Sequence, residues 1–305
     1  MLDGIGWFIA QIGAAYLNFL SAIAQPGLWL DWSNPEAMGR FIYYGASTEF
    51  FFVVFTAFLT LTVIGAFATG FLWAVVRGME GFANILGRTV AWIGLVMVLQ
   101  QIVIIFLQRV FRVSAIEFGP FAPFGYPILP GITFAKDLSW WSEELKLYNA
   151  MIVCLCVTYT FVQGGHVRVD LVYSNVRFRA KKVIDMFGSV FFMMMGATLT
   201  WLFAWHFRWR SRVTPKVSAS ESLEIILRKA KIMKWNVETI GFSPNGFDAY
   251  FLFKFLMVAF CGLVFLHGCA FFWRSFLEFR EGPTSEGRYI DRDAPGDSAS
   301  ELKTH

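Results

Sequence analysis

The sequence predicts an all-α membrane protein that crosses the bilayer several times, with a four-helix core and one or two extra N-terminal hydrophobic helices. Its 305 residues are 56% hydrophobic and only 16% charged, whereas soluble domains carry about 25% charged residues. A soluble fold could not bury that much apolar surface, so lipid must cover it. The apolar runs are continuous and do not alternate, which favours helices over barrel strands.

About 20 apolar residues of helix cross a hydrocarbon core about 30 Å thick. Runs without charged residues predict membrane-spanning helices at 50–76, 89–108, 147–165, 186–207 and 255–273. The earlier run 5–24 is more polar and is rich in Gly and Ala. We expect a spanning or re-entrant helix there, with a helix in the membrane interface as the alternative. Asp3 replaces the positive charge that a cleavable signal peptide would have.

The connecting segments divide the chain further. Four prolines between 117 and 136 predict a stiff extended loop. Ser218 and Glu221 form a capping-box pattern ahead of apolar residues at helical spacing, so 218–235 is interpreted as an amphipathic helix lying in the interface. The tail after Arg280 has the composition of a disordered segment. The expected domains are an N-terminal extension at 1–82, a membrane domain at 83–280 and a tail at 281–305.

The Lys and Arg counts do not fix the orientation. If the predicted spans alternate, segments 77–88 and 166–185 and the tail after Trp273 share one side with twelve basic residues, against thirteen on the other. The positive-inside rule needs a larger difference than this.

The chemistry in the predicted spans is sparse. Between their flanking charges they contain no ionisable carboxylate or amine, whereas a carrier of ions or acids would normally have charged or interrupted helices at mid-depth. His206 and His267 lie near span ends and could ligate a haem, but ordinary interfacial histidines are the more common case. The four cysteines form no disulfide framework. We therefore expect neither an enzyme nor a resident cofactor or metal.

The segment 140–182 is the most informative. Ser142 can cap a helix whose first turn holds Glu143 and Glu144, and Gly164 and Gly165 can end it in a left-handed cap. A turn with His166, Arg168 and Asp170 and a basic run ending at Lys182 follow. Helix caps and orienting charges would explain these residues in any polytopic protein, and this reading stays open for each of them.

The particular strings add a resemblance. EEL opens one span, GGHVRVD closes it, a basic run opens the next, and the preceding span ends in QRVFR, which contains Arg109. Together they resemble the small membrane subunit of tripartite ATP-independent periplasmic (TRAP) transporters over about 83–280. The helices before residue 83 are additions to that family's core.

The resemblance implies a partner-bound role in a bacterial inner membrane. In such systems a large membrane subunit holds the sodium and substrate sites, and a periplasmic binding protein delivers an organic acid. The small subunit is a scaffold in contact with the large subunit and membrane lipids, with no nucleic-acid partner. The resemblance also implies that the turn after Gly164 and the C-terminus are cytoplasmic.

The candidate interface or fold-closing residues are Arg109, Glu143, Glu144, Gly164, Gly165, His166, Arg168 and Asp170. The alternative function is an accessory structural subunit of another membrane complex, respiratory or photosynthetic.

Overall fold

A computed structural model describes residues 2–118, 134–164, 176–210, 218, 220–230, 247 and 249–291. Helices make up most of this part of the chain. The helical segments that are long and apolar enough to cross a membrane are Gly4–Ala24, Thr48–Phe67, Thr69–Val110, Phe178–Arg210 and Tyr250–Glu281. The predicted class, a polytopic membrane protein made of helices, is confirmed.

The N-terminal region consists of α1 (Leu2–Ala24), α2 (Gly27–Leu30), α3 (Pro35–Tyr44) and α4 (Thr48–Phe67). Side chains cap two of these helices, because Asn34 Oδ1 accepts from Glu36 N at 2.9 Å and Ser47 Oγ accepts from Phe50 N at 3.2 Å. Helix α1 packs on α4, where the Tyr16 and Thr60 hydroxyls lie 2.7 Å apart. Most of its other apolar side chains are exposed, as they would be in contact with lipid.

The span predicted at 50–76 is present but ends earlier than predicted, because the chain turns at Ala68. Helix α4 ends at Phe67, and α5 (Thr69–Ile105) begins directly after the turn. A Cβ on Gly65 would lie 2.4 Å from Leu72 Cδ2, so glycine permits the close packing of the two helices. Neither a charge nor a proline marks this turn in the sequence, which is why hydropathy does not detect it.

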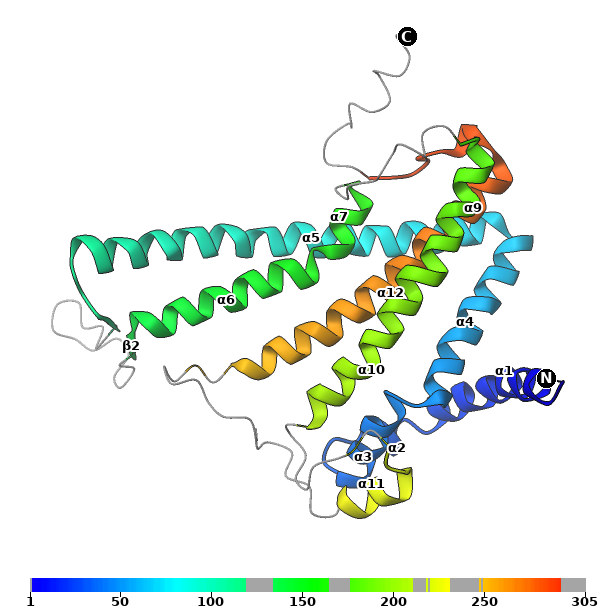
Figure 1. Ribbon diagram of the computed structural model, residues 1–305, viewed down its shortest axis with the longest axis horizontal. Coiled ribbons are helices and arrows are strands. Elements are labelled where there is room, and N and C mark those ends of the chain that lie inside the picture. The colour runs from blue at the N-terminus through cyan, green and yellow to red at the C-terminus, as the bar shows by residue number, and fades with distance from the viewer. Residues whose placement is uncertain are drawn as a thin grey trace, which may run out of the picture.

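Helix α5 is far longer than one membrane crossing. With the π-helical turn η1 (Phe106–Val110) it forms a segment of 42 residues, about 63 Å at 1.5 Å per residue. The hydrocarbon core is about 30 Å thick, so this helix must tilt steeply or extend beyond it. Figure 1 shows it as a long rod lying across the direction of α4. The expected domain boundary between residues 82 and 83 falls inside this helix.

A small β-ladder is the exception to the helical architecture. Strands β1 (Ala115–Phe118) and β2 (Phe134–Asp137) pair antiparallel, with Ala115 opposite Asp137. These strands form the two ends of the proline-rich connection that was predicted as an extended loop. The middle of that loop lies outside the described residues.

The span predicted at 147–165 is interrupted. Helix α6 (Leu138–Leu155) ends before Cys156, and the shorter α7 (Val157–Val162) continues with a changed direction (Figure 1). Helix α7 crosses α5 at Gly87, where a Cβ would lie 2.2 Å from Tyr159 Cβ. The break therefore allows α7 to approach the backbone of α5 closely.

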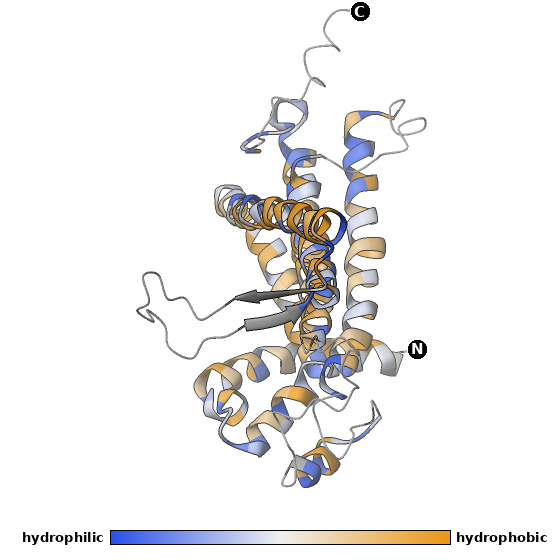
Figure 2. Ribbon diagram, turned by 90° about the vertical axis from the view of Figure 1, so that its left-hand side faces the viewer, coloured by the Kyte–Doolittle hydropathy of each residue, from blue (hydrophilic) through white to orange (hydrophobic). Residues whose placement is uncertain are grey.

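The remaining elements include the central helix of the molecule, α12. They are α9 (Phe178–Gly188), the π-helical turn η3 (Ser189–Met194), α10 (Met195–Arg210), α11 (Leu223–Ala230), α12 (Tyr250–Glu281) and the 3-10 turn η4 (Pro283–Ser285). Helix α12 contacts α5, α6, α7, α9 and α10, and it contributes buried residues to three apolar clusters, among them Leu277, Cys261 and Leu256. Figure 2 shows apolar residues along the length of the main helices.

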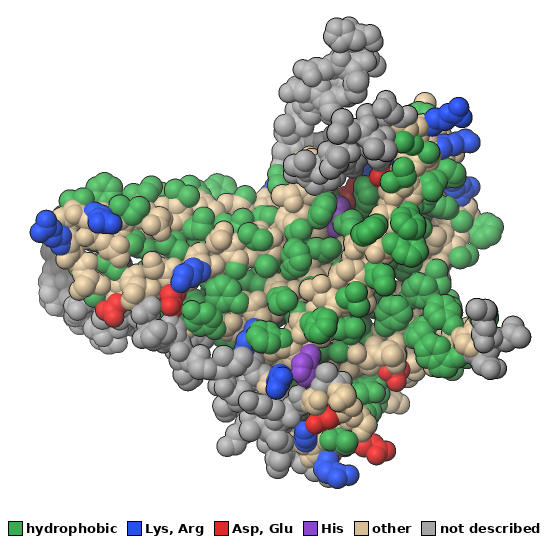
Figure 3. Space-filling view, viewed as in Figure 1, with side chains coloured by type: hydrophobic (Ala, Val, Ile, Leu, Met, Phe, Trp, Pro, Cys, Tyr) green, Lys and Arg blue, Asp and Glu red, His purple; other side chains and the backbone are tan. Residues whose placement is uncertain are grey.

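The charged connections gather at two ends of the molecule. At one end, residues of 77–88, 178–182 and 274–291 meet, as in the pair Arg88–Asp291 at 2.9 Å. At the other, Trp205 Nε1 donates to Ile42 O at 2.9 Å, and Ile226 of α11 is buried in the same cluster. The meeting of 77–88, 178–182 and 274–291 agrees with one of the two groups of segments that alternating spans require. Lys and Arg side chains are grouped near the end of α9 in Figure 3.

Part of the helix predicted at 218–235 is present, but it does not lie against lipid as predicted. The described part, α11, packs its apolar side on α3. Protein, not lipid, therefore covers Ile226, while Ile225 stays exposed. Residues 231–235 lie outside the described part of the chain.

The tail predicted as disordered from residue 281 has a folded beginning. Residues 281–291 have a defined course, and Gly282 and Gly287 supply the positive φ angles of its turns, 88° and 69°. Residues 292–305 are not described.

Candidate functional site

Four charged side chains meet where α5, α9 and α12 come together. Glu80, Lys182, Arg274 and Glu278, here called the charge cluster, are each less than 10% exposed. All four lie outside the predicted uncharged spans. Arg274 and Glu278 are nevertheless helical, because α12 continues past Trp273 for two more turns. Burial of charge on this scale requires close pairing.

The pairing in the charge cluster is close to complete. Arg274 makes a two-pronged contact with Glu80, with Nε at 2.6 Å from Oε1 and Nη2 at 2.5 Å from Oε2. Lys182 Nζ lies 2.7 Å from Glu278 Oε2, and Arg274 Nη1 lies 3.4 Å from Glu278 Oε1. Arg274 also stacks over the Trp73 ring at 5.4 Å. Two positive and two negative groups thus neutralise one another within the protein.

The C-terminal segment closes over the charge cluster. Gly287 N donates to Glu278 Oε1 at 3.2 Å, and Arg274 Nη1 donates to Arg288 O at 3.0 Å. Further along, Asn84 Nδ2 donates to Asp291 O at 2.8 Å. The last contact joins residues about 200 positions apart in the sequence, Asn84 and Asp291. The arrangement can therefore fix the relative positions of three helices.

The two predicted glutamates lie on α6, and Glu144 contacts α5. Glu144 Oε2 accepts from Gln100 Nε2 at 3.0 Å, and its Oε1 accepts from the Tyr148 hydroxyl at 2.7 Å. Glu143 is buried at 7% exposure. Their expected place in the first helical turn is wrong, because α6 begins at Leu138 with Asp137 as its N-cap residue. Glu144 instead links two membrane helices.

The other predicted residues do not gather with the glutamates. Arg109 is exposed in η1, near the far end of α5. Gly164 follows α7 and has φ 76°, the left-handed conformation expected of a helix-ending glycine. Gly165, His166, Arg168 and Asp170 lie outside the described residues, so their predicted roles at an interface stay predictions.

The charge cluster and an aromatic group at the other end were not predicted from the sequence. On α10, Trp201 and Trp205 stack with ring centroids 5.3 Å apart, and Trp209 meets Trp205 edge-on. Phe41 of α3 packs against Trp205 and Trp209. The one available signal for the charge cluster was Arg274 and Glu278 at a spacing of four residues. Their partner Glu80 is too distant in the sequence to be recognised.

The described part of the chain also contains residues of the kinds that ligate metals and haem. No group of three His, Cys, Asp or Glu side chains suited to a metal ion occurs among these residues. His267 stacks on the Phe161 ring at 5.1 Å, and the haem hypothesis for His206 and His267 stays untested.

A comparison with protein families matches residues 132–222 to the family described as tripartite ATP-independent periplasmic transporters, DctQ component. The matched stretch begins just before α6 and ends just before α11, and it includes Glu143, Glu144 and the GGHVRVD string. It covers less than a third of the chain. Neither the comparison with curated proteins nor that with solved structures found a match.

Proposed function

We propose that the chain is a scaffold for the large membrane subunit of a tripartite ATP-independent periplasmic transporter, because residues 132–222 match the family of the DctQ component of such transporters. The large subunit binds the substrate and the coupling cation, and a periplasmic binding protein delivers an organic acid. The family match is the observation on which this proposal depends.

The structure supports the role of a scaffold more than the role of a carrier. The buried charges of the charge cluster are occupied with one another, which leaves them unsuited to bind and release an ion in each transport cycle. Much apolar surface of α5 and α10 is exposed, and in a membrane such surface is available to lipid and to partner helices.

We further propose that the charge-cluster end is cytoplasmic and that α11 lies on the periplasmic side of a bacterial inner membrane. The support is the family resemblance of the Gly164 turn together with the basic residues of α9. Trp residues near both ends fit the depth of the two membrane interfaces.

Affinity purification of the tagged chain from its native membrane tests the proposal. A large polytopic permease should co-purify, and a periplasmic binding protein should associate with the pair when substrate is present. Recovery of a respiratory or photosynthetic complex instead would overturn it.

A second experiment tests the division of labour. Vesicles reconstituted with this chain alone should show no cation-driven uptake of carboxylic acids, whereas vesicles with both membrane subunits should. Uptake by this chain alone would contradict a scaffold role.

A further inference from the structure

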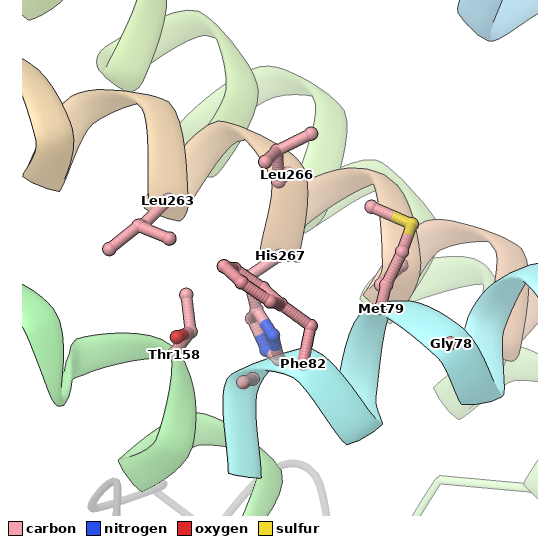
Figure 4. A pocket seen from close by; sticks show the side chains of 9 residues that line it. Gly78, Met79, Phe82, Thr158, Leu263, Leu266 and His267 are labelled. Atoms are coloured by element: carbon pink, nitrogen blue, oxygen red, sulfur yellow. The ribbon is translucent and has the colours of Figure 1, made fainter. Parts of the chain in front are cut away.

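Two surface features near the charge cluster could receive a ligand. One is a pocket of about 200 Å³ between α5, α7 and α12, which is mostly apolar and has Thr158 and His267 as its polar side chains (Figure 4). Such a lining does not identify what would fill it. The other feature is a group of three exposed arginines, Arg77, Arg280 and Arg288, here called the arginine group. Their charges and surroundings point to a ligand of defined chemistry.

Tyr289 holds two members of the arginine group together. The guanidinium carbon of Arg77 lies 4.9 Å from the centre of the Tyr289 ring, and that of Arg288 lies 4.7 Å from it. The same ring meets Trp73 edge-on, with the ring centroids 5.6 Å apart. A guanidinium that stacks on a ring keeps the N–H donors at its edge available to oxygen acceptors.

Arg280 lies at the end of a membrane-spanning helix. Its Nη1 donates to Ala66 O, one residue before α4 ends at Phe67. Since α4 is long and apolar enough to cross a membrane, its end lies at the depth where the lipid headgroups begin. The residue after Arg280, Glu281, accepts from Trp73 Nε1 at 2.7 Å. Arg280 is therefore close to the other two arginines.

Two of these three positive charges are not neutralised by the described residues. Glu281 Oε2 lies 3.4 Å from Arg288 Nη1 and compensates that arginine. Arg77 and Arg280 contact a ring and a carbonyl instead, and neither has a carboxylate within 4 Å in the part of the chain that the structure describes. The charge cluster, by contrast, is buried and its charges sum to zero. Two exposed guanidinium groups thus remain to bind an anion from outside the chain.

Exposed phenylalanines adjoin the arginine group. Phe67, the residue after Ala66, is 89% exposed, and Phe71 in the first turn of α5 is 48% exposed. A small soluble anion matches the charge of the arginines but leaves these rings uncovered, and so does an acidic segment of another protein. A ligand with an anionic head and apolar chains matches both parts of the surface.

We propose that the arginine group binds the phosphate of an anionic phospholipid, whose acyl chains lie against Phe67 and Phe71. A guanidinium can bind two phosphate oxygens through parallel N–H donors, and uncompensated positive charge at the membrane surface favours anionic over zwitterionic lipids. The bound lipid joins α4, α5 and the C-terminal segment at the membrane surface. This binding does not depend on a partner subunit.

The retention of lipid by the purified chain tests the proposal. The full chain is purified in detergent with equal amounts of phosphatidylglycerol, which is anionic, and phosphatidylcholine, which is zwitterionic, and mass spectrometry of the intact protein counts the lipids that stay bound. We expect the wild type to prefer phosphatidylglycerol, and Arg77→Gln combined with Arg280→Gln to reduce this preference about tenfold. Equal retention of the two lipids by the wild type would overturn the proposal, as would an unchanged preference in the double variant.

A matched control removes the same charge elsewhere. Arg210→Gln combined with Arg228→Gln changes two exposed arginines on α10 and α11 and should leave the preference intact. An equal loss in both double variants would reveal an effect of net charge alone and rule out the site. Phosphatidylglycerol should also raise the thermal stability of the wild type. Equal stabilisation by inorganic phosphate or by a polyglutamate peptide would overturn the choice of a lipid.

Phe67→Ser gives a test that leaves the arginines in place. Because this side chain is 89% exposed, the substitution should not change the thermal stability of the lipid-free chain, but it should weaken the retention of phosphatidylglycerol about threefold. Phe203→Ser on α10, where the side chain is 76% exposed, is the control and should have a smaller effect. Equal effects of the two substitutions would contradict the placement of the acyl chains.

Discussion

At the scale of single residues, the pair Glu80–Arg274 is the most consequential contact. Both side chains are buried, and two nitrogens of the guanidinium face two carboxylate oxygens. Such a pair adds little net stability compared with apolar residues, but loss of one partner strands a charge in the interior. The pair therefore selects one arrangement of α5 against α12 more than it strengthens the fold.

Arg274→Met should destabilise the protein by about 3–5 kcal/mol, because Glu80 is left without a cation. The free energy of unfolding in detergent measures this. Arg88→Gln is the control, since the Arg88–Asp291 pair is 43% and 63% exposed and should cost less than about 1 kcal/mol. A double variant with Glu80→Gln should recover part of the loss. Equal effects of Arg274→Met and Arg88→Gln would contradict the assignment.

At the scale of elements, close crossings and helix breaks determine how the helices meet. The break at Cys156 and the turn at Ala68 both lie inside runs of apolar residues, where composition gives no boundary. Hydropathy therefore predicted that these segments are helical and lie in the membrane but could not show where they bend. Of the predicted helix ends, Gly164 takes the left-handed conformation that its sequence position suggested, whereas α6 begins at Leu138 and not after the predicted cap at Ser142.

Gly87→Ala should destabilise the crossing of α5 and α7, because the new Cβ would lie 2.2 Å from Tyr159 Cβ. We expect a loss of about 1–3 kcal/mol, measured by thermal unfolding. Gly81→Ala on the same helix meets open space and should stabilise by about 0.5–1 kcal/mol through helix propensity. The same sign for both variants would count against a tight crossing.

The ion pair between Glu221, just before α11, and Lys229, on α11, should depend on pH. The side-chain hydrogen bond from Lys229 is the largest cause that lowers the pKa of Glu221 below its ordinary value of 4.5. A lowered pKa in the folded state means that the stabilisation is present above that value and is lost as the pH falls through the folded pKa. A fluorescent label at Ile225, which is 43% exposed, should report loosening only in this acidic range. In Glu221→Gln the response should be absent, and a response above pH 6 would exclude this pair as its cause.

At the scale of the whole molecule, the sequence predicted the class, most of the membrane segments and one of the two groups of connections. It could not predict the charge cluster, because Glu80 and Arg274 meet only after α5 and α12 have packed. Nor could it predict that residues 281–291 fold back, since their composition resembles that of a disordered tail. Long-range pairing has no signature in a single sequence.

Single cysteines at Glu224 and Glu286 should label from opposite sides of the membrane. Both positions are exposed, one on α11 and one beside the charge cluster. In a background that lacks the four native cysteines, an impermeant maleimide should modify position 224 in intact spheroplasts and position 286 only after lysis. Labelling of both from the outside would contradict the proposed orientation.

The balance of charge in the charge cluster determines how the cluster responds to the membrane potential. An elementary charge that moves across 100 mV exchanges about 2.3 kcal/mol with the field, but Glu80, Glu278, Lys182 and Arg274 sum to zero and are held together by mutual contacts. Voltage exerts almost no net force on such a quartet. In an energised cell the membrane potential would therefore not move this part of the protein.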